Sequence, residues 1–333
     1  MTFDTLKLDK GLYTSEMGFT KSLEMIDPSE NYKGTELEGL DAYERQLKRF
    51  DIKVKGSNSD TISKFFQTSD SAVLFPEYIR RSVAAVVLQD NVVDDLVATT
   101  TVVDSLDYRS VQCEPVDSDK IVESFITEGA FIPETNIKTN DKLTKLKKSG
   151  RSLVASYEAI KSQRLDLFAV MLRQIGNYIN SCQLAQAVTA LSYDGSGVVE
   201  TQIKNEISYS DFISLYTELA PYEFNTLIAE TNEFKKIINM SEFKDGTAGL
   251  DFHGTGRPIT PLGAKLIHCK TNVLEGAIVV LDKNFALEKV QFGDIVTDYD
   301  KLIDRQIEKA TVTSTVGFNR IVNRACVNLV PKN

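Results

Sequence analysis

The sequence is poor in the residues from which catalytic and metal sites are usually built. It has only two histidines, His253 and His268, and its four cysteines lie far apart, without the CxxC spacing that is typical of zinc and redox sites. His253 falls in a glycine-rich loop and His268 in an expected strand, and spacing joins neither to a Cys, Asp or Glu. The loop also lacks the strand-to-helix phosphate cradle of nucleotide-binding proteins. We therefore predict no catalytic residue, no metal site and no cofactor, in a protein that is not an enzyme.

Long apolar runs are absent as well. No stretch approaches the roughly 18–20 consecutive apolar residues that a membrane helix needs, and the N-terminal residues lack the basic start and apolar core of a signal peptide. We therefore expect synthesis in the cytoplasm and no membrane partner. Because no disulfide framework is indicated, four cysteines are predicted to be buried free thiols: Cys113, Cys182, Cys269 and Cys326.

Positive charge is also in short supply. Lys and Arg number 38 against 47 Asp and Glu, so the net charge is -9 at pH 7. This balance argues against a general nucleic-acid-binding protein, whose affinity would come from clustered Lys and Arg. The chain is 42% hydrophobic and 26% charged over 333 residues, which predicts a globular protein with the core of one large or two ordinary domains.

The most informative stretch is 121–191, which begins as a charged, extended segment. Its acidic residues come early and its basic residues late: Glu123, Glu128 and Glu134, then Lys142, Lys145, Lys147, Lys148 and Arg151. Two strands of opposite charge pair well across a hairpin, but an isolated two-stranded ribbon is only marginally stable in water. We therefore expect another copy of the same chain to cover this ribbon.

One long amphipathic helix follows the extended segment. Apolar residues recur at helical spacing: Tyr157, Ile160, Phe168, Met171, Ile175, Tyr178, Cys182, Ala185 and Val188. Ser156 and Ser162 are alternative N-caps, and the DGSG turn at 194–197 ends the helix, so its length is about 45 Å. We expect this stripe to pack on a sheet, with Gly176 as a point of close packing or a slight bend.

The order of these segments resembles the major capsid proteins of tailed bacteriophages, the fold typed on the Hong Kong ninety-seven phage. The resemblance rests on EGAFIPE, the basic strand LTKLKKSGRSLVASYEAI, the long helix and the DGSG turn. SAVLFPEYIRRSV precedes them and a strand-rich C-terminal stretch follows, so it covers about residues 70–330. It implies an α+β fold with a peripheral domain, an axial domain, a long spine helix, an extended E-loop and an N-terminal arm.

The expected division of the chain follows from this resemblance. It comprises an N-terminal arm (1–66), the first part of the peripheral domain (67–112), the E-loop (113–150), the spine helix (151–195), the axial domain (196–295) and the C-terminal peripheral strands (296–333). The arm is polar and only DAYERQLKRF looks helical, so we expect it to become ordered only against neighbouring subunits. The strands after Asp298 are expected to return to the first sheet.

The resemblance implies a shell-building function. The protein would self-assemble into pentamers and hexamers, form the icosahedral head of a virion, and enclose double-stranded DNA without sequence-specific binding. The implied partners are neighbouring subunits, reached through the E-loop and the arm, and portal and scaffold proteins, with decoration proteins left open. Two alternatives remain: an encapsulin-like nanocompartment shell of the same fold, and a soluble hydrolase or binding module, which the missing catalytic residues disfavour.

Some members of this fold join their subunits through a lysine–asparagine isopeptide bond. The residues at matching places are Lys138, Lys142 and Lys145 in the loop and Asn319 or Asn323 near the C-terminus. Lysines and asparagines are common in such segments in any case. We therefore expect the loop to act through salt bridges and strand contacts rather than through a covalent bond.

Overall fold

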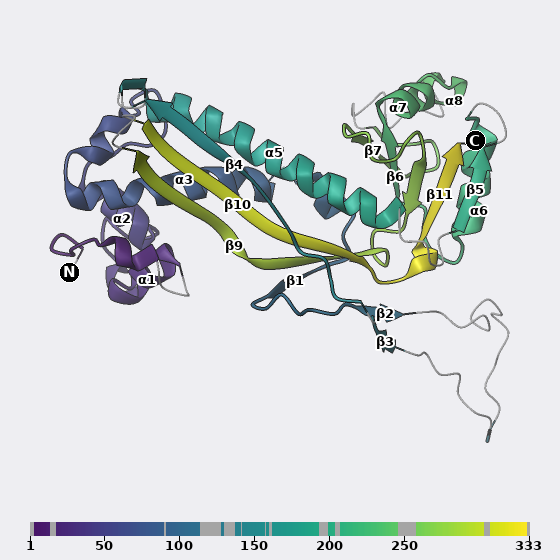
Figure 1. The fold of residues 1–333 in the computed structure, drawn as a ribbon, viewed down its shortest axis with the longest axis horizontal. Helices are drawn as coiled ribbons and strands as arrows, with labels where there is room; N and C mark the ends of the chain where they lie inside the picture. The colour runs from purple at the N-terminus through teal and green to yellow at the C-terminus, as the bar shows by residue number, and fades with distance from the viewer. Residues whose placement is uncertain are drawn as a thin grey trace. The chain divides into compact units, whose positions relative to one another are not determined.

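A computed structural model gives the structure of the chain at residues 3–13, 18–89, 91–113, 128–129, 137–140, 142–156, 158–159, 162–192, 199–203, 207–245, 258–302 and 307–331. The chain divides into two compact units. Unit 1 comprises Met1–Asp90, Gly150–Ile179 and Ile295–Ser314, and unit 2 comprises Asn91–Ser149, Asn180–Asp294 and Thr315–Asn333. Helices and sheets occur together throughout, which confirms the predicted α+β class (Figure 1).

The α-helices and strands alternate along the chain. The helices are α1 (Phe19–Ile26), α2 (Ala42–Arg49), α3 (Ser69–Gln89), α5 (Leu165–Ser192), α6 (Tyr209–Leu219), α7 (Thr231–Ile238) and α8 (Ser241–Lys244). The strands are β1 (Thr99–Val103), β2 (Val111–Cys113), β3 (Ile137–Thr139), β4 (Lys147–Ser156), β5 (Val199–Ile203), β6 (Thr226–Glu230), β7 (Lys265–Cys269), β8 (Ile278–Leu281), β9 (Leu287–Leu302), β10 (Ile307–Arg320) and β11 (Cys326–Pro331).

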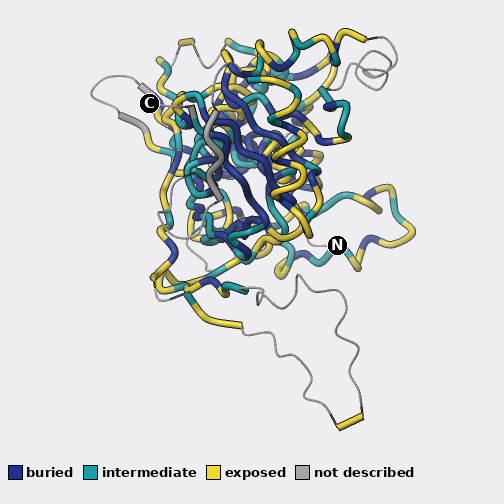
Figure 2. Tube along the Cα trace, turned by 90° about the vertical axis from the view of Figure 1, so that its right-hand side faces the viewer, coloured by how far each residue is buried: buried dark blue, intermediate teal, exposed yellow. Residues whose placement is uncertain are grey.

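The strands form two larger sheets and one two-stranded ribbon. One sheet has the order β1-β9-β10-β4, with β1 parallel to β9, and the other has the order β5-β11-β8-β6-β7 (Figure 1). The expectation that all C-terminal strands return to the first sheet is wrong for β11, which lies between β5 and β8. The described side chains of β6, β8 and β11 are mostly buried on both faces (Figure 2), and such strands occupy the inside of a covered sheet.

Helix α5 is the long helix that the sequence predicts, but it begins later than expected. Its first residue is Leu165 because the backbone just before it pairs with another segment: Ile62 donates to the Gln163 carbonyl at 2.9 Å, and Leu165 donates to the Asp60 carbonyl at 2.9 Å. A backbone engaged in this bridge cannot continue the helix towards Ser156. The predicted positions Tyr157 and Ile160 lie outside the described residues.

The buried stripe of α5 differs in part from the predicted one. Phe168, Ile175 and Val188 are buried as predicted, but Met171 and Tyr178 are 38% and 39% exposed. The places of these two are taken by the next residues along the helix, Leu172 and Ile179, which are fully buried. Cys182 and Ala185 are only half-buried. The buried stripe therefore differs from the predicted one. Its residues recur about every 3.6 residues counted from Leu165, where α5 begins, and not from Tyr157.

Helix α5 packs closely on α3 in unit 1. A Cβ atom at Gly176 would lie 2.9 Å from Cβ of Val86 and 3.3 Å from the carbonyl oxygen of Val83. The absence of a side chain at Gly176 therefore allows the close approach, which confirms the first of the two roles predicted for it. About two turns before Gly176 in α5, the Phe168 ring stacks on Phe75 and Tyr78 of α3, at centroid distances of 5.9 Å and 6.4 Å.

The first 66 residues are not an arm without a core. Side chains from this segment lie in the same hydrophobic core as α3 and α5: Leu8, Phe19, Leu23, Ala42, Tyr43, Leu47, Ile52, Ile62 and Phe65. Helix α2 begins with a capping box, in which Asp41 accepts from the Glu44 amide at 2.8 Å. The expectation that neighbouring subunits are needed to order this segment is wrong, because its few apolar residues pack against α3 rather than against one another.

A buried ion pair also stabilises this segment. Arg45 is fully buried and its Nε lies 3.0 Å from Oδ2 of Asp27, while its guanidinium stacks over the Tyr32 ring at 4.4 Å. Tyr32 donates to the same Asp27 carboxylate at 2.5 Å. A buried charge is tolerated only when it is paired and hydrogen-bonded, so these three residues must assemble together.

Helix α3 contains Pro76, and next to it a tyrosine hydroxyl bridges two groups of the backbone hydrogen-bond ladder. The Glu77 amide donates to Oη of Tyr13 at 3.0 Å, and that hydroxyl donates to the Val73 carbonyl at 2.7 Å. A proline inside a helix opens the hydrogen-bond ladder by removing a donor and crowding the preceding turn. The hydroxyl of Tyr13 thus satisfies two backbone groups of α3 and joins the N-terminal segment to it.

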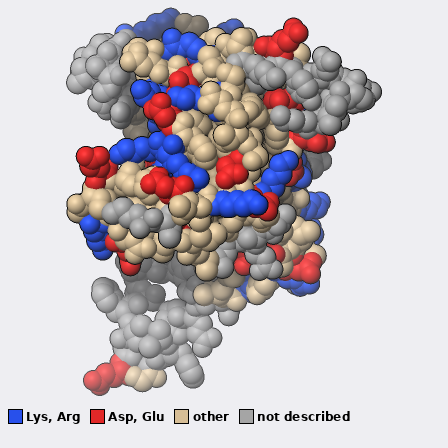
Figure 3. Space-filling view, turned by 90° about the vertical axis from the view of Figure 1, so that its left-hand side faces the viewer, with Lys and Arg blue, Asp and Glu red and all other residues tan. Residues whose placement is uncertain are grey.

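Glu77 extends this junction with its buried carboxylate. It accepts hydrogen bonds from Arg80 at 2.8 Å, from Arg81 at 3.0 Å and from the Thr20 hydroxyl at 2.5 Å. Burial disfavours the ionised carboxylate, but the hydrogen bonds and charge of Arg80, with the hydrogen bonds of Thr20 and Arg81, hold the pKa of Glu77 below its ordinary value. Figure 3 shows Lys and Arg interleaved with Asp and Glu on the face that carries α1 and α2.

The first prediction compares a buried and an exposed apolar residue of α5. Phe168→Ala is expected to lower the free energy of unfolding by about 3–5 kcal/mol, because it leaves a cavity beside Phe75 and Tyr78. Met171→Ala, at an exposed position, should cost less than about 1 kcal/mol. Equal denaturation midpoints for the two variants would contradict the orientation of the helix.

The second prediction isolates the Tyr13 hydroxyl. Tyr13→Phe keeps the ring but leaves the Glu77 amide and the Val73 carbonyl unpaired, so unfolding should become easier by about 1–3 kcal/mol. Tyr216→Phe is the matched control because Tyr216 is 52% exposed, and its effect should stay within about 0.5 kcal/mol. Chemical denaturation followed by circular dichroism measures both, and a Tyr13→Phe protein as stable as the control would show that the hydroxyl does not hold the segment.

Candidate assembly surfaces

Two short strands of unit 2, β2 and β3, form an antiparallel stem that flanks residues 114–136. In this stem β2 pairs with β3 in the register Val111↔Thr139, Gln112↔Lys138 and Cys113↔Ile137. This pairing joins other residues than the predicted hairpin, whose basic residues Lys147, Lys148 and Arg151 lie on β4 beside β10. The predicted acidic residues Glu123 and Glu134 lie outside the described residues, so the predicted pairing of acidic and basic arms stays a prediction.

A buried carboxylate on β9 anchors the root of the stem. Glu288, which is 5% exposed, accepts hydrogen bonds from the hydroxyls of Thr101 at 2.5 Å, of Tyr108 at 2.7 Å, and of Ser110. Burial, and then the neighbouring Glu288 carboxylate, raise the pKa of the Tyr108 phenol, which therefore stays a donor. Three segments thus meet at one acceptor: β1, the residues before β2, and β9.

Backbone hydrogen bonds fix the direction of the stem. Asn140 donates to the Ser110 carbonyl at 2.8 Å and Thr144 to the Tyr108 carbonyl at 2.9 Å, while Cys113 donates to Ile321 at 3.0 Å. Beside them Gly317 of β10 leaves no room for a side chain, because a Cβ there would lie 2.9 Å from Thr144 Cγ2. The stem is therefore held on a rigid base, although its own strands are only three residues long.

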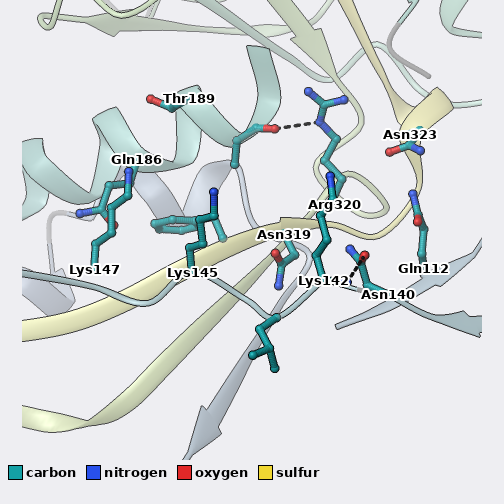
Figure 4. A pocket seen from close by; sticks show the side chains of 13 residues that line it. Gln112, Asn140, Lys142, Lys145, Lys147, Gln186, Thr189, Asn319, Arg320 and Asn323 are labelled. Atoms are coloured by element: carbon teal, nitrogen blue, oxygen red, sulfur yellow. Dashed lines mark hydrogen bonds between the residues drawn. The ribbon is translucent and has the colours of Figure 1, made fainter. Parts of the chain in front are cut away.

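Beside the stem lies a polar hollow of about 550 Å³ (Figure 4). Its lining comes from the stem, the irregular segment leading into β4, the end of α5, and the end of β10 with the residues after it: Gln112, Asn140, Lys142, Leu143, Lys145, Lys147, Gln186, Thr189, Ala190, Phe318, Asn319, Arg320 and Asn323. Figure 4 shows the Lys142, Lys145 and Lys147 side chains projecting from one extended segment of the chain. The sequence did not indicate this hollow, since its residues come from four separate stretches.

Four of the five residues considered for a cross-link line this hollow. These are Lys142, Lys145, Asn319 and Asn323, whereas Lys138 lies on β3. The Asn319 side-chain amide donates to the Thr144 hydroxyl of the same chain. The side chains therefore meet within one subunit, and the expectation that they act non-covalently stays a prediction.

The end of α5 is capped by side chains from the C-terminal strands. Arg320 donates from Nε to the Ala190 carbonyl at 2.8 Å and from Nη2 to the Leu191 carbonyl at 2.6 Å, and Asn328 donates to Leu191 at 3.4 Å. The last carbonyls of a helix have no partner within it and favour a positive charge. The cap therefore joins the end of α5 to β10 and β11 in unit 2.

The two histidines and four cysteines do not form a site in the described residues. His253 lies outside them, and His268 lies on the edge strand β7, between the Thr231 hydroxyl at 2.9 Å and the Phe234 ring. Burial and the charge of Lys270 lower the pKa of His268, which favours its neutral form. No group of three or more His, Cys, Asp or Glu in the described chain is arranged to hold a metal ion.

The cysteine prediction is confirmed in one respect and wrong in another. All four thiols are free, but only Cys269 and Cys326 are buried, while Cys113 and Cys182 are half-buried. Cys113 is the last residue of β2 in the stem, and Cys182 lies on a partly exposed turn of α5. Burial raises the pKa of the Cys326 thiol to about 12. None of the described helices combines the length and apolar character needed to span a membrane.

Apolar side chains remain exposed on the stem and on the stretches that flank it. Val102 of β1 is 64% exposed, Leu106 is 62% exposed and Ile137 of β3 is 71% exposed. Val111 and Leu143 in the same part of the chain are also exposed. Scattered exposed apolar residues are normal, but several on the stem and the stretches that flank it indicate a surface that can be covered by another molecule.

Comparison with solved structures shows the fold. No protein-family model and no curated protein sequence matches the chain. A virus-like particle protein from Pyrococcus furiosus superposes with a TM-score of 0.52 at 12% identity, over 76% of this chain and 98% of that chain. The chain has the Hong Kong ninety-seven-type capsid fold. The capsid of an empty GTA particle shares this fold, with a TM-score of 0.52 at 12% identity over 72% of this chain and 89% of that chain.

The capsid fold confirms the resemblance drawn from the order of the segments. At this level of identity the shared property is the path of the backbone, because few side chains are the same. The sequence signals that found it were the charged segment followed by a long proline-free helix, which the structure places at β2–β4 and α5. The sequence did not indicate the roles of Glu288 and Tyr13, because the hydrogen-bond partners of each are distant in the sequence.

The third prediction tests the anchor of the stem. Glu288→Gln keeps the size of the side chain but replaces one acceptor oxygen with a donor, so one of the three hydroxyls loses its partner. We expect a loss of about 1–3 kcal/mol in the free energy of unfolding and faster amide hydrogen exchange at 108–113 and 137–144. The exposed Glu223→Gln is the matched control, and unchanged exchange in the Glu288 variant would show that the carboxylate does not fix the stem.

Proposed function

We propose that this protein is the major capsid protein of a tailed bacteriophage, which self-assembles into pentamers and hexamers of an icosahedral head. The observation that carries the proposal is the capsid fold, shared over nearly the whole length of the virus-like particle protein and most of the GTA capsid protein. Both of those proteins are described as parts of particles. The role is mechanical rather than catalytic, and the protein would reside in the virion after synthesis in the host cytoplasm.

The parts of the capsid fold are assigned to the chain as follows. Helix α5 is the spine helix, residues 113–150 are the E-loop, and residues 196–295 form the axial domain, with residues 67–112 and 296–333 contributing to the peripheral domain. Two points modify this division. Strand β11 pairs with the strands of the axial segment, and residues 1–66 are packed on α3 instead of extending as an arm.

The stem and its surroundings support a contact between subunits. The root of the stem is fixed by Glu288 and by backbone hydrogen bonds, so the E-loop that it carries has a defined starting direction. The exposed apolar residues there, such as Val102 and Ile137, gain stability only when another surface covers them. A neighbouring copy of the chain is the proposed cover, and portal and scaffold proteins are proposed as further partners.

The net charge of -9 suits a shell that encloses DNA without binding it tightly. The proposed contents are double-stranded DNA, held by the closed shell rather than by sequence-specific contacts. Acidic and basic residues interleave on the face shown in Figure 3, which presents no single strongly basic surface there. Packaged DNA can then remain free to leave the head.

A cellular nanocompartment shell is the second candidate. It is kept because the virus-like particle protein covers this chain as well as the GTA capsid protein does, with the same TM-score. The two candidates differ in what the particle contains. Particles isolated from the native source that contain nuclease-protected DNA support the virion, whereas particles that contain a protein cargo and no DNA support the nanocompartment.

The fourth prediction concerns assembly of the purified protein. Permanent assemblies commonly bury more than about 2,000 Å² per interface, so at micromolar concentration the protein should sediment as rings, shells or tubes and show them in negative-stain images. A stable monomer in near-physiological salt would contradict the proposed function.

A loop variant is the control for this assembly test. In it, a short glycine turn replaces residues 114–136 and joins Cys113 to Ile137, which are already paired across the stem. The subunit should unfold at the same denaturant concentration as the wild type, because its cores are untouched, but it should not close shells. Normal particles from this variant would show that the loop has no role between subunits.

A further inference from the structure

The hollow beside the stem has a lining rich in hydrogen-bond donors. Lys142, Lys145 and Lys147 supply three ammonium groups, and no acidic residue lines it in the described part of the chain (Figure 4). None of the three lysines forms an ion pair or a side-chain hydrogen bond with a described residue. Three like charges around one hollow repel each other, and this repulsion falls when an anion is bound between them.

A buried guanidinium gives a second, independent indication. The Arg320 side chain lines the hollow and is 7% exposed as a residue. Two of its nitrogens cap α5, but Nη1 is buried and has no hydrogen-bond partner among the described residues. A buried donor left unpaired is costly, especially on a charged group. Its presence beside three lysines indicates that an acceptor belongs there.

We propose that this hollow binds an anion that carries several phosphate groups. Phosphate oxygens accept hydrogen bonds and carry negative charge, so they match ammonium, guanidinium and amide donors together. A volume of about 550 Å³ lies within the roughly 300–1,000 Å³ of small-molecule sites. The amides of Asn140 and Asn323 supply further polar groups around the same space. This site does not depend on the proposed shell function.

The lysines and the arginine have different parts in the binding. The three lysines are exposed, so they attract the anion from solution through charge, and this attraction weakens with salt. Arg320 is fixed by its two bonds to the α5 carbonyls and so holds its orientation before the anion arrives. Binding should therefore weaken as ionic strength rises.

Inorganic tripolyphosphate is the probe for the fifth prediction, measured by isothermal titration calorimetry on the full-length protein in low salt. The triple variant Lys142→Gln, Lys145→Gln, Lys147→Gln should bind at least about tenfold more weakly, since three charged contacts are lost together. The matched control changes three exposed lysines of unit 2 in the same way: Lys235→Gln, Lys244→Gln and Lys283→Gln. It should differ from the wild type by less than about twofold. No binding by the wild type, or equal weakening in both triple variants, would overturn the site.

Lysine acylation followed by mass spectrometry tests the site without any substitution. Tripolyphosphate should reduce labelling of Lys142, Lys145 and Lys147 in the wild-type protein and leave Lys235 and Lys283 unchanged. Labelling that does not respond to tripolyphosphate counts against the proposal. If the three lysines are protected in assembled particles without added phosphate, a neighbouring copy fills the hollow and the proposal is wrong.

A competition experiment with duplex DNA identifies the source of the phosphate groups. A short duplex that competes with tripolyphosphate, and whose binding falls in the Lys142/Lys145/Lys147 variant but not in the control, would mean that a nucleic-acid backbone can supply the phosphate groups. A duplex that does not compete would mean that the site takes a free polyphosphorylated anion. Both results support the phosphate chemistry of the hollow.

Discussion

The packing of unit 1 depends on the turn of α3 that contains Pro76. The proline opens the hydrogen-bond ladder there, and the hydroxyl of Tyr13 enters it between the Glu77 amide and the Val73 carbonyl. In the same helix, Glu77 accepts a hydrogen bond from the Thr20 hydroxyl, and the ring of Phe75 stacks on Phe168 of α5. An interruption that would weaken an isolated helix is thus the point at which the N-terminal segment is attached.

Buried carboxylates serve the same purpose elsewhere in the chain. Glu288 gathers three hydroxyls at the root of the stem. Glu230 accepts the Leu274 amide at 2.6 Å, and Asp282 accepts the Glu223 amide at 2.9 Å. Each of these acids is buried and joins segments far apart in the sequence. Because a carboxylate accepts several hydrogen bonds at once, one residue can satisfy the polar groups of loops that form no regular structure.

The sequence predicted those parts of the fold that depend on local pattern. The long helix and its buried Phe168 and Ile175 follow from helical spacing. The parts that depend on distant partners were not predictable. The first 66 residues look too polar to form a core of their own, but their apolar side chains pack against the apolar face of α3. The hollow beside the stem is made by four stretches that only the folded chain brings together.

The stem has a consequence for how this protein can change under mutation and selection. Cys113 and Ile137 are fixed as a pair whatever chain lies between them. The entropy of closing a flexible loop grows slowly with its length, by about 0.6 kcal/mol per doubling. Insertions and deletions between this pair therefore cost the fold little, and residues 114–136 can diverge faster than the base that carries them. Selection on that stretch acts on what it touches, while selection on Glu288 and Gly317 acts on whether it is presented at all.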